Sequence, residues 1–132
     1  MEQKIASYKI EHVFLIESNF KRNINIDFTS SPIKNNLDIH TEAFDTEPSN
    51  NIFVVNLTAT FEGIQNDQVV FTILVKVAGV FSRMGDTSLS EETFKKVNAP
   101  AILFPFVREN IAGIALKAGL GNILLPPINF TP

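Results

Sequence analysis

Residues 98–130, NAPAILFPFVRENIAGIALKAGLGNILLPPINF, contain the longest helical pattern in the chain and decide its fold class. Asn98 is the predicted N-cap, and Pro100 suits the first turn because the N–H that proline lacks would be unpaired there anyway. Gly119 is a natural left-handed stop after the helix. Apolar residues recur at i, i+3 and i+4 and predict one broad stripe: Ile102, Leu103, Phe106, Val107, Ile111, Ile114 and Ala118.

Small residues lie beside this stripe, so another element could approach the helix closely. One long helix cannot easily cover a sheet of four strands, and the helices of a partner subunit could complete the cover. We therefore expect the helix to lie inside an oligomer. The expected interface consists of Phe106, Ile111, Ala112 and Ala115.

The chain before this helix has the two-residue alternation of β-strands. The predicted strands cover residues 8–16, 37–43, 52–62 and 68–84, with a hairpin at 63–67 and a long, apolar connection at 17–36. Gly79 predicts either a bulge or a close approach of another element within the last strand. Ser88 to Glu91 matches a capping box that would open a short helix. The sequence thus predicts one α+β domain, residues 1–132, with a four-stranded antiparallel meander and a long C-terminal helix.

The composition excludes several classes of protein. No cysteine is present, which excludes disulfides and thiolate chemistry and fits a cytoplasmic location. The net charge is −3 and the basic residues are scattered, which argues against a nucleic-acid partner. The N-terminus lacks the features of a signal peptide, and no stretch approaches the ~20 apolar residues of a membrane helix.

The sequence offers little for catalysis or for metal and cofactor binding. General acid–base or nucleophilic chemistry needs a histidine, cysteine or carboxylate with an orienting partner. The two histidines, His12 and His40, lie in alternating strands without a third ligand at metal-binding spacing. Each is expected to satisfy a local hydrogen bond, so we predict that the chain is not an enzyme.

Two segments expected to be loops carry many apolar residues. One contains Phe20, Ile24, Phe28 and Ile33, and the other contains Leu120, Ile123, Leu124, Leu125, Ile128 and Phe130. These side chains either pack over the core or line a groove, because exposed they would favour aggregation. An apolar groove flanked by strand edges could hold unfolded polypeptide without sequence specificity.

The motifs LFPFVRE at residues 103–109, PINF at 127–130 and AGVFS at 78–82 resemble the SecB family of protein-export chaperones in sequence, order and spacing. Two departures stand out. The family usually has Gly-Phe-Pro after the helix, where this chain has Gly-Leu-Gly at 119–121 and one residue fewer. Family members usually continue into a second helix and an acidic tail, whereas this sequence ends at Pro132.

The resemblance implies an ATP-independent holdase that forms a homotetramer, a dimer of dimers with helices between two sheets. It implies grooves between the crossover loop, the second strand and the segment after the helix. Carried over by position, the client-binding residues would be Phe20, Ile24, Phe28, Ile33, Leu37, Ile39, Ile123, Leu125, Ile128 and Phe130. Asp67, at the hairpin tip, would contact the export ATPase SecA.

A second hypothesis remains open. The same groove could belong to a binding protein dedicated to one partner, such as an antitoxin, or to one ligand. The lack of the acidic tail favours a narrower clientele over coupling to SecA. One ligand that stays bound through purification would support this alternative.

Overall fold

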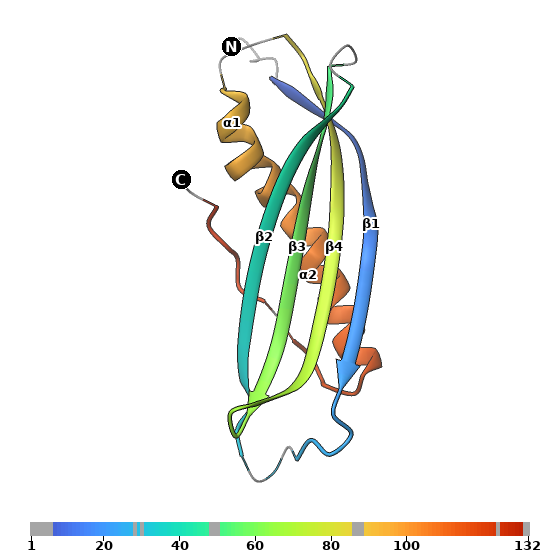
Figure 1. The fold of residues 1–132 in the computed structure, drawn as a ribbon, viewed down its shortest axis with the longest axis vertical. Coiled ribbons are helices and arrows are strands. Elements are labelled where there is room, and N and C mark those ends of the chain that lie inside the picture. Colours follow the sequence, from blue (N-terminus) through green and yellow to red (C-terminus); the bar gives the residue numbers. More distant parts are fainter. Residues whose placement is uncertain are drawn as a thin grey trace.

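A four-stranded antiparallel sheet carries one long helix along one face (Figure 1). The computed structural model describes residues 7–27, 29, 31–47, 51–85, 89–123 and 125–130. The strands are β1 (Tyr8–Arg22), β2 (Lys34–Glu47), β3 (Ile52–Gln65) and β4 (Gln68–Arg83). The helical elements are α1 (Glu91–Thr93), η2 (Phe94–Asn98) and α2 (Ala99–Lys117). The predicted α+β fold is confirmed.

The strand order is β1-β4-β3-β2, so the chain forms the predicted meander from β2 to β4 and β1 joins it beside β4. The β3–β4 hairpin turns at Asn66 and Asp67, whose φ angles are 53° and 63°. Positive φ at both central residues is typical of the type I′ turn, which matches the twist of the flanking strands. β1 and β2 are the two edges of this sheet.

β1 is longer than the sequence pattern predicts. The polar residues after Ile16 do not end the strand, because a register shift between Leu15 and Glu17 absorbs one residue and pairing with β4 continues to Arg22. Phe20 therefore pairs with Ile73 and packs against the core. The prediction that placed Phe20 in a loop is wrong, because it lies in β1.

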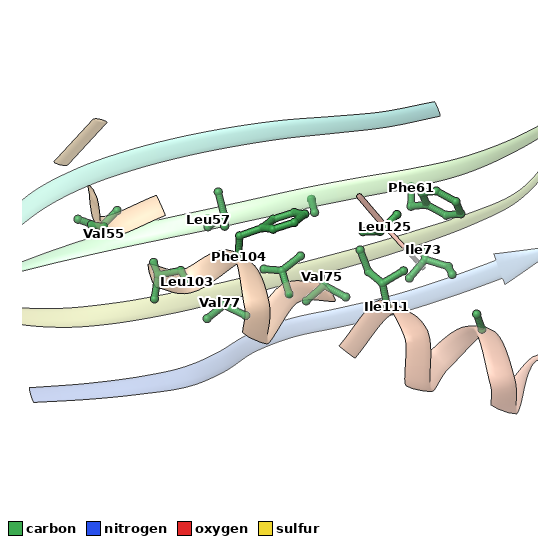
Figure 2. Packing of buried hydrophobic residues seen from close by; sticks show 14 of the residues in the cluster. Val55, Leu57, Phe61, Ile73, Val75, Val77, Leu103, Phe104, Ile111 and Leu125 are labelled. Carbon is green, nitrogen blue, oxygen red and sulfur yellow. The ribbon is translucent and has the colours of Figure 1, made fainter. Parts of the chain in front are cut away.

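The core lies between α2 and one face of β3 and β4 (Figure 2). Alternate residues of the two central strands point to it, including Val55, Leu57, Ile73, Val75 and Val77. Leu103 of α2 sits above Gly79, where an added Cβ would lie 2.8 Å from the Cδ2 atom of Leu103. Gly79 thus permits a close approach of helix and strand, which is one of the two alternatives that the sequence predicts; the other, a bulge, does not occur at this position.

The helix begins earlier than predicted. Ser90 is the N-cap, and its Oγ accepts a hydrogen bond from the N–H of Thr93 at 3.2 Å. From Glu91 the chain stays helical through η2 into α2, so Asn98 lies inside the helix and makes no capping bond. Ser88 lies outside the described residues. Pro100 has no N–H for the carbonyl four residues before it, which is consistent with the π-helical turn at this point.

The buried side of α2 differs from the predicted stripe. Leu103, Val107, Ile111 and Ala115 form one row at spacing four, and all are fully buried against the sheet. Ile111 and Ala115 were expected at an oligomer interface; that prediction is wrong, because they belong to the core of their own chain. Phe106 is 44% exposed on another side of the helix.

By length and composition alone, the helical stretch Glu91–Lys117 could span a membrane, which the sequence analysis did not anticipate. Its inner row is fully buried against the sheet, and the core helix of a soluble protein meets the same criteria of length and composition. The stretch is therefore weak evidence for a membrane span.

An ion-pair cluster fixes the start of the helix to the end of the sheet. The Arg83 guanidinium donates to the carboxylates of Glu91 and Asp45, and the Lys95 ammonium donates to Glu91 at 2.8 Å. The hydrogen bonds from Arg83, followed by those from Lys95, lower the pKa of Glu91 to about 2 despite partial burial.

This pKa predicts how stability depends on pH. A lowered folded-state pKa contributes stability that is present above the unfolded pKa of about 4.3 and is lost as pH falls toward 2. Glu91→Gln should therefore be less stable than wild type near neutral pH, and the difference should shrink with acidification. Urea unfolding at several pH values measures it. Glu92→Gln is the matched control, because the Glu92–Lys96 pair is mostly solvent-exposed. A difference that is constant with pH would contradict the prediction.

Candidate functional site

A cavity of about 550 Å³ opens between β2 and the segment that follows α2. We call it the β2 cavity. It is lined by Asn35, Leu37, Phe61, Asn122, Ile123, Leu125 and Pro126. Most of the lining side chains are apolar, and two asparagine side chains supply polar groups. No charged side chain appears among these lining residues.

Strand register explains why Leu37 and Phe61 meet at this cavity. Successive side chains of β2 point to opposite faces of the sheet. Leu37 and Ile39 face the helix side, whereas Asp38 and His40 face away from it. Leu37 pairs with Phe61 on β3, whose ring lies against Phe71 with centroids 6.0 Å apart. Because β2 is an edge strand, Leu37 is only partly buried.

The segment after α2 forms the other wall. Gly119, at φ 73°, ends the helix, and the Arg22 guanidinium donates to the carbonyl of Ala118 at this end. The segment then crosses to the β2 side of the molecule (Figure 1). Leu125 is buried in the core cluster, and Phe130 packs on Phe104 with ring centroids 6.0 Å apart.

The crossover loop (residues 23–33) joins β1 to β2 at the hairpin end of the sheet (Figure 1). Ile26 and Ile33 pack against the core, whereas Ile24 is 86% exposed. Phe28 lies outside the described residues. The loop is held in place by the buried side chain of Gln65, which donates to the backbone carbonyls of Asp27 and Ser31.

The structure brings some of the predicted client-binding residues together. Leu37, Ile123 and Leu125 line one cavity, and Ile39 is the next inward residue on β2. Ile128, Phe130 and Ile33 are partly buried against the core. Phe20 and Ile24 lie elsewhere, on β1 and on the crossover loop.

Sequence reasoning missed four lining residues: Asn35, Phe61, Asn122 and Pro126. Phe61 shared the alternation of the buried β3 residues, so the pattern alone marked it as core. Its pairing with Leu37 would have indicated a second role, but register between strands is set by the folded sheet. Asn35 and Asn122 belong to no periodic pattern in the sequence that would have placed them at a site.

This lining determines what the site can bind. Apolar side chains of an incoming chain would gain about 25 cal/mol for each Å² that they bury in the cavity. The amides of Asn35 and Asn122 can donate to and accept from a peptide backbone, as can the outer edge of β2. Neither kind of contact selects a particular sequence.

None of the described residues that line the cavity is a histidine, a cysteine or a carboxylate. His12 pairs with Val80 and His40 pairs with Thr58, so β3 and β4 separate the two histidines. Within the described residues, no cluster of three His, Cys, Asp or Glu side chains could hold a metal ion.

The sequence matches the SecB family, described as preprotein translocase subunit SecB, over residues 2–132. A protein-export protein SecB from Aromatoleum aromaticum is 28% identical over 89% of this chain and 79% of its own length. That of Anaplasma phagocytophilum is 37% identical over 61% of this chain and 52% of its own length.

A similar fold occurs in a solved SecB-like chaperone from Mycobacterium tuberculosis, which is in complex with a ChAD peptide from the HigA1 antitoxin. The TM-score is 0.79 at 16% identity, over 96% of this chain and 93% of that one. At this identity the likeness concerns the fold. The family match extends over almost the whole sequence and includes both walls of the β2 cavity. This chain therefore belongs to the SecB family.

Proposed function

We propose that the protein is an ATP-independent chaperone that holds unfolded polypeptides, with clients destined for export among its substrates. The observation that carries the proposal is the apolar β2 cavity beside an edge strand. The cavity accepts client side chains, and the backbone of β2 pairs with the client backbone. The proposed client-binding residues are Leu37, Ile39, Ile123, Leu125, Ile128, Phe130, Ile24, Phe28 and Ile33.

Binding of this kind is strong only when several sites act together. One client side chain that buries about 100 Å² gains about 2.5 kcal/mol, which is well below the cost of association. An unfolded chain that reaches several cavities at once gains effective concentration at each further site. This argument favours an assembly that carries several copies of the cavity.

We further propose that the assembly is a homotetramer, a dimer of dimers. β1 is an edge strand, and its residues Ile10 and Leu15 are 44% and 47% exposed. The outer side of α2 exposes Phe106 and Leu116, at 44% and 58%. Edges and apolar patches of this kind are usually covered by a partner. We retain Phe106 and Ala112 as interface residues.

Asp67 is the proposed contact for the export ATPase SecA, in a cytoplasmic setting. It lies exposed at the tip of the β3–β4 hairpin, beyond the strand ends. Its carboxylate can meet a basic surface there without any change in the sheet.

A second candidate function is the binding of one dedicated client protein. It is favoured by the similarity to the M. tuberculosis chaperone, which was solved with an antitoxin peptide. Both functions would use the β2 cavity and differ in the range of clients that bind.

Suppression of aggregation tests the proposal. The purified protein, without nucleotide, should prevent light scattering by a range of chemically unfolded proteins diluted into buffer. Protection of none of them would contradict the chaperone function. Protection of only one encoded partner would support the dedicated function instead.

A further inference from the structure

Hydrogen bonds hold the described residues at the start of the crossover loop. The N–H of Asn23 donates to the carbonyl of Val70 at 2.7 Å, which joins the start of the loop to β4. The Asn23 side chain then accepts from the N–H of Asn25, and the Asp27 side chain accepts from the N–H and hydroxyl of Thr29. The bonds at Asn25 and Thr29 hold the loop backbone locally, and only the bond from Asn23 reaches the sheet.

Gln65 supplies a second connection to the sheet, at the later residues Asp27 and Ser31. It is the last residue of β3, it is 7% exposed, and its amide nitrogen donates to the carbonyls of Asp27 and Ser31, the latter at 3.0 Å. One –NH₂ group has two protons, so these two bonds use its full donor capacity. The bonds join two loop positions four residues apart to a single buried side chain.

The held loop presents an apolar side chain to solvent. Ile24 is 86% exposed, although Ile26, two residues later, packs against the core. When the loop backbone is already held, contact between this isoleucine and a partner costs little further backbone conformational entropy. On a loose loop, the same contact would require the backbone to be ordered at the moment of binding.

We propose that Gln65 is a positioning residue for client binding, acting through the crossover loop to present Ile24 to the unfolded chain. The inference rests on the proposed chaperone function. Gln65 touches no client in this account. Its contribution is to hold the loop before the client arrives.

The main variant is Gln65→Met, which has a similar length and no donors. The two carbonyls that it releases belong to a loop with several exposed residues and can bind water instead. Gln68→Met is the matched control, because Gln68 follows the same hairpin and is exposed. Gln65→Asn, one methylene shorter, provides the same comparison should Gln65→Met fail to fold.

The probe is reduced, carboxymethylated lysozyme with a fluorescent label, which cannot refold. Gln65→Met should bind it about tenfold more weakly than wild type, roughly the cost of ordering one backbone residue on binding. Gln68→Met should bind as wild type does. Hydrogen exchange over residues 23–33 should accelerate in Gln65→Met, with exchange over α2 unchanged.

Double mutants separate positioning from a general loss of stability. In an Ile24→Ser background the effect of Gln65→Met on affinity should largely disappear, whereas in a Leu37→Ser background it should persist, because Leu37 lies in the separate β2 cavity. Equal effects in the two backgrounds, or unchanged affinity despite faster loop exchange, would overturn the inference. Wild-type protein that does not bind the probe would overturn the chaperone function, and the inference with it.

Discussion

Leu37→Asp is expected to weaken the binding of unfolded clients by at least about tenfold, because a carboxylate without a partner would stand where apolar client side chains are buried. Leu37 lines the β2 cavity together with Ile123 and Leu125, and no lysine or arginine among the lining residues could neutralise the new charge. Titration of labelled, carboxymethylated lysozyme measures the effect. The fold should survive, since Leu37 is only partly buried on an edge strand.

The matched control is Asn36→Asp on the same strand. Asn36 is exposed and faces away from the helix, so this variant adds the same charge outside the cavity. It should bind the client as wild type does. Equal losses in the two variants would indicate a general effect of negative charge and would contradict the assignment of the cavity.

Leu103→Ala is expected to lower the free energy of unfolding by about 2–5 kcal/mol, the range measured for large-to-small changes in closely packed cores. Leu103 is fully buried, and its Cδ2 atom would lie 2.8 Å from a Cβ added at Gly79. Urea denaturation measures the change, provided that unfolding is compared at one protein concentration.

Ile102→Ala is the control for this prediction. Ile102 is the preceding residue and is only partly buried, so its truncation should cost clearly less. The two positions were indistinguishable in the apolar stripe predicted from the sequence. A larger loss at Ile102 would show that this residue, and the side of the helix it occupies, carries more of the packing.

The sequence was sufficient to predict the parts of the fold that depend on periodicity. Alternation located β3 and β4, because their buried residues belong to central strands with one face on the core. The left-handed stop at Gly119 was also predicted correctly, because its φ of 73° favours glycine. A close approach was one of the two predictions for Gly79, where a Cβ atom would clash with Leu103. The SecB motifs resembled the family that the comparison confirms.

The parts that could not be predicted depend on tertiary structure. The end of β1 required knowledge of a register shift that lets the strand continue through polar residues. The start of the helix could not be predicted without knowing that a π-helical turn before Pro100 joins the preceding helical residues to α2. The inward row of α2 was assigned too broadly, because the pattern could not separate residues that face the sheet from those, such as Phe106, that an oligomer would cover.

The residues of the candidate site also fall into two groups: some could be predicted from the sequence, and the others depend on tertiary structure. Leu37, Ile123 and Leu125 were predicted because apolar residues in loops and at a strand edge are unusual. Phe61 was hidden among core residues, and Gln65 gave no signal at all. A buried glutamine becomes meaningful only when the carbonyls that it reaches are known.

The central claim is that several β2 cavities act together on one unfolded chain. The most direct test is the light-scattering mass of the protein, alone and then with carboxymethylated lysozyme. The account predicts a particle of about four chains of 14.7 kDa that gains the mass of the client and stays soluble. A 14.7 kDa monomer whose mass does not change when the client is added would contradict it.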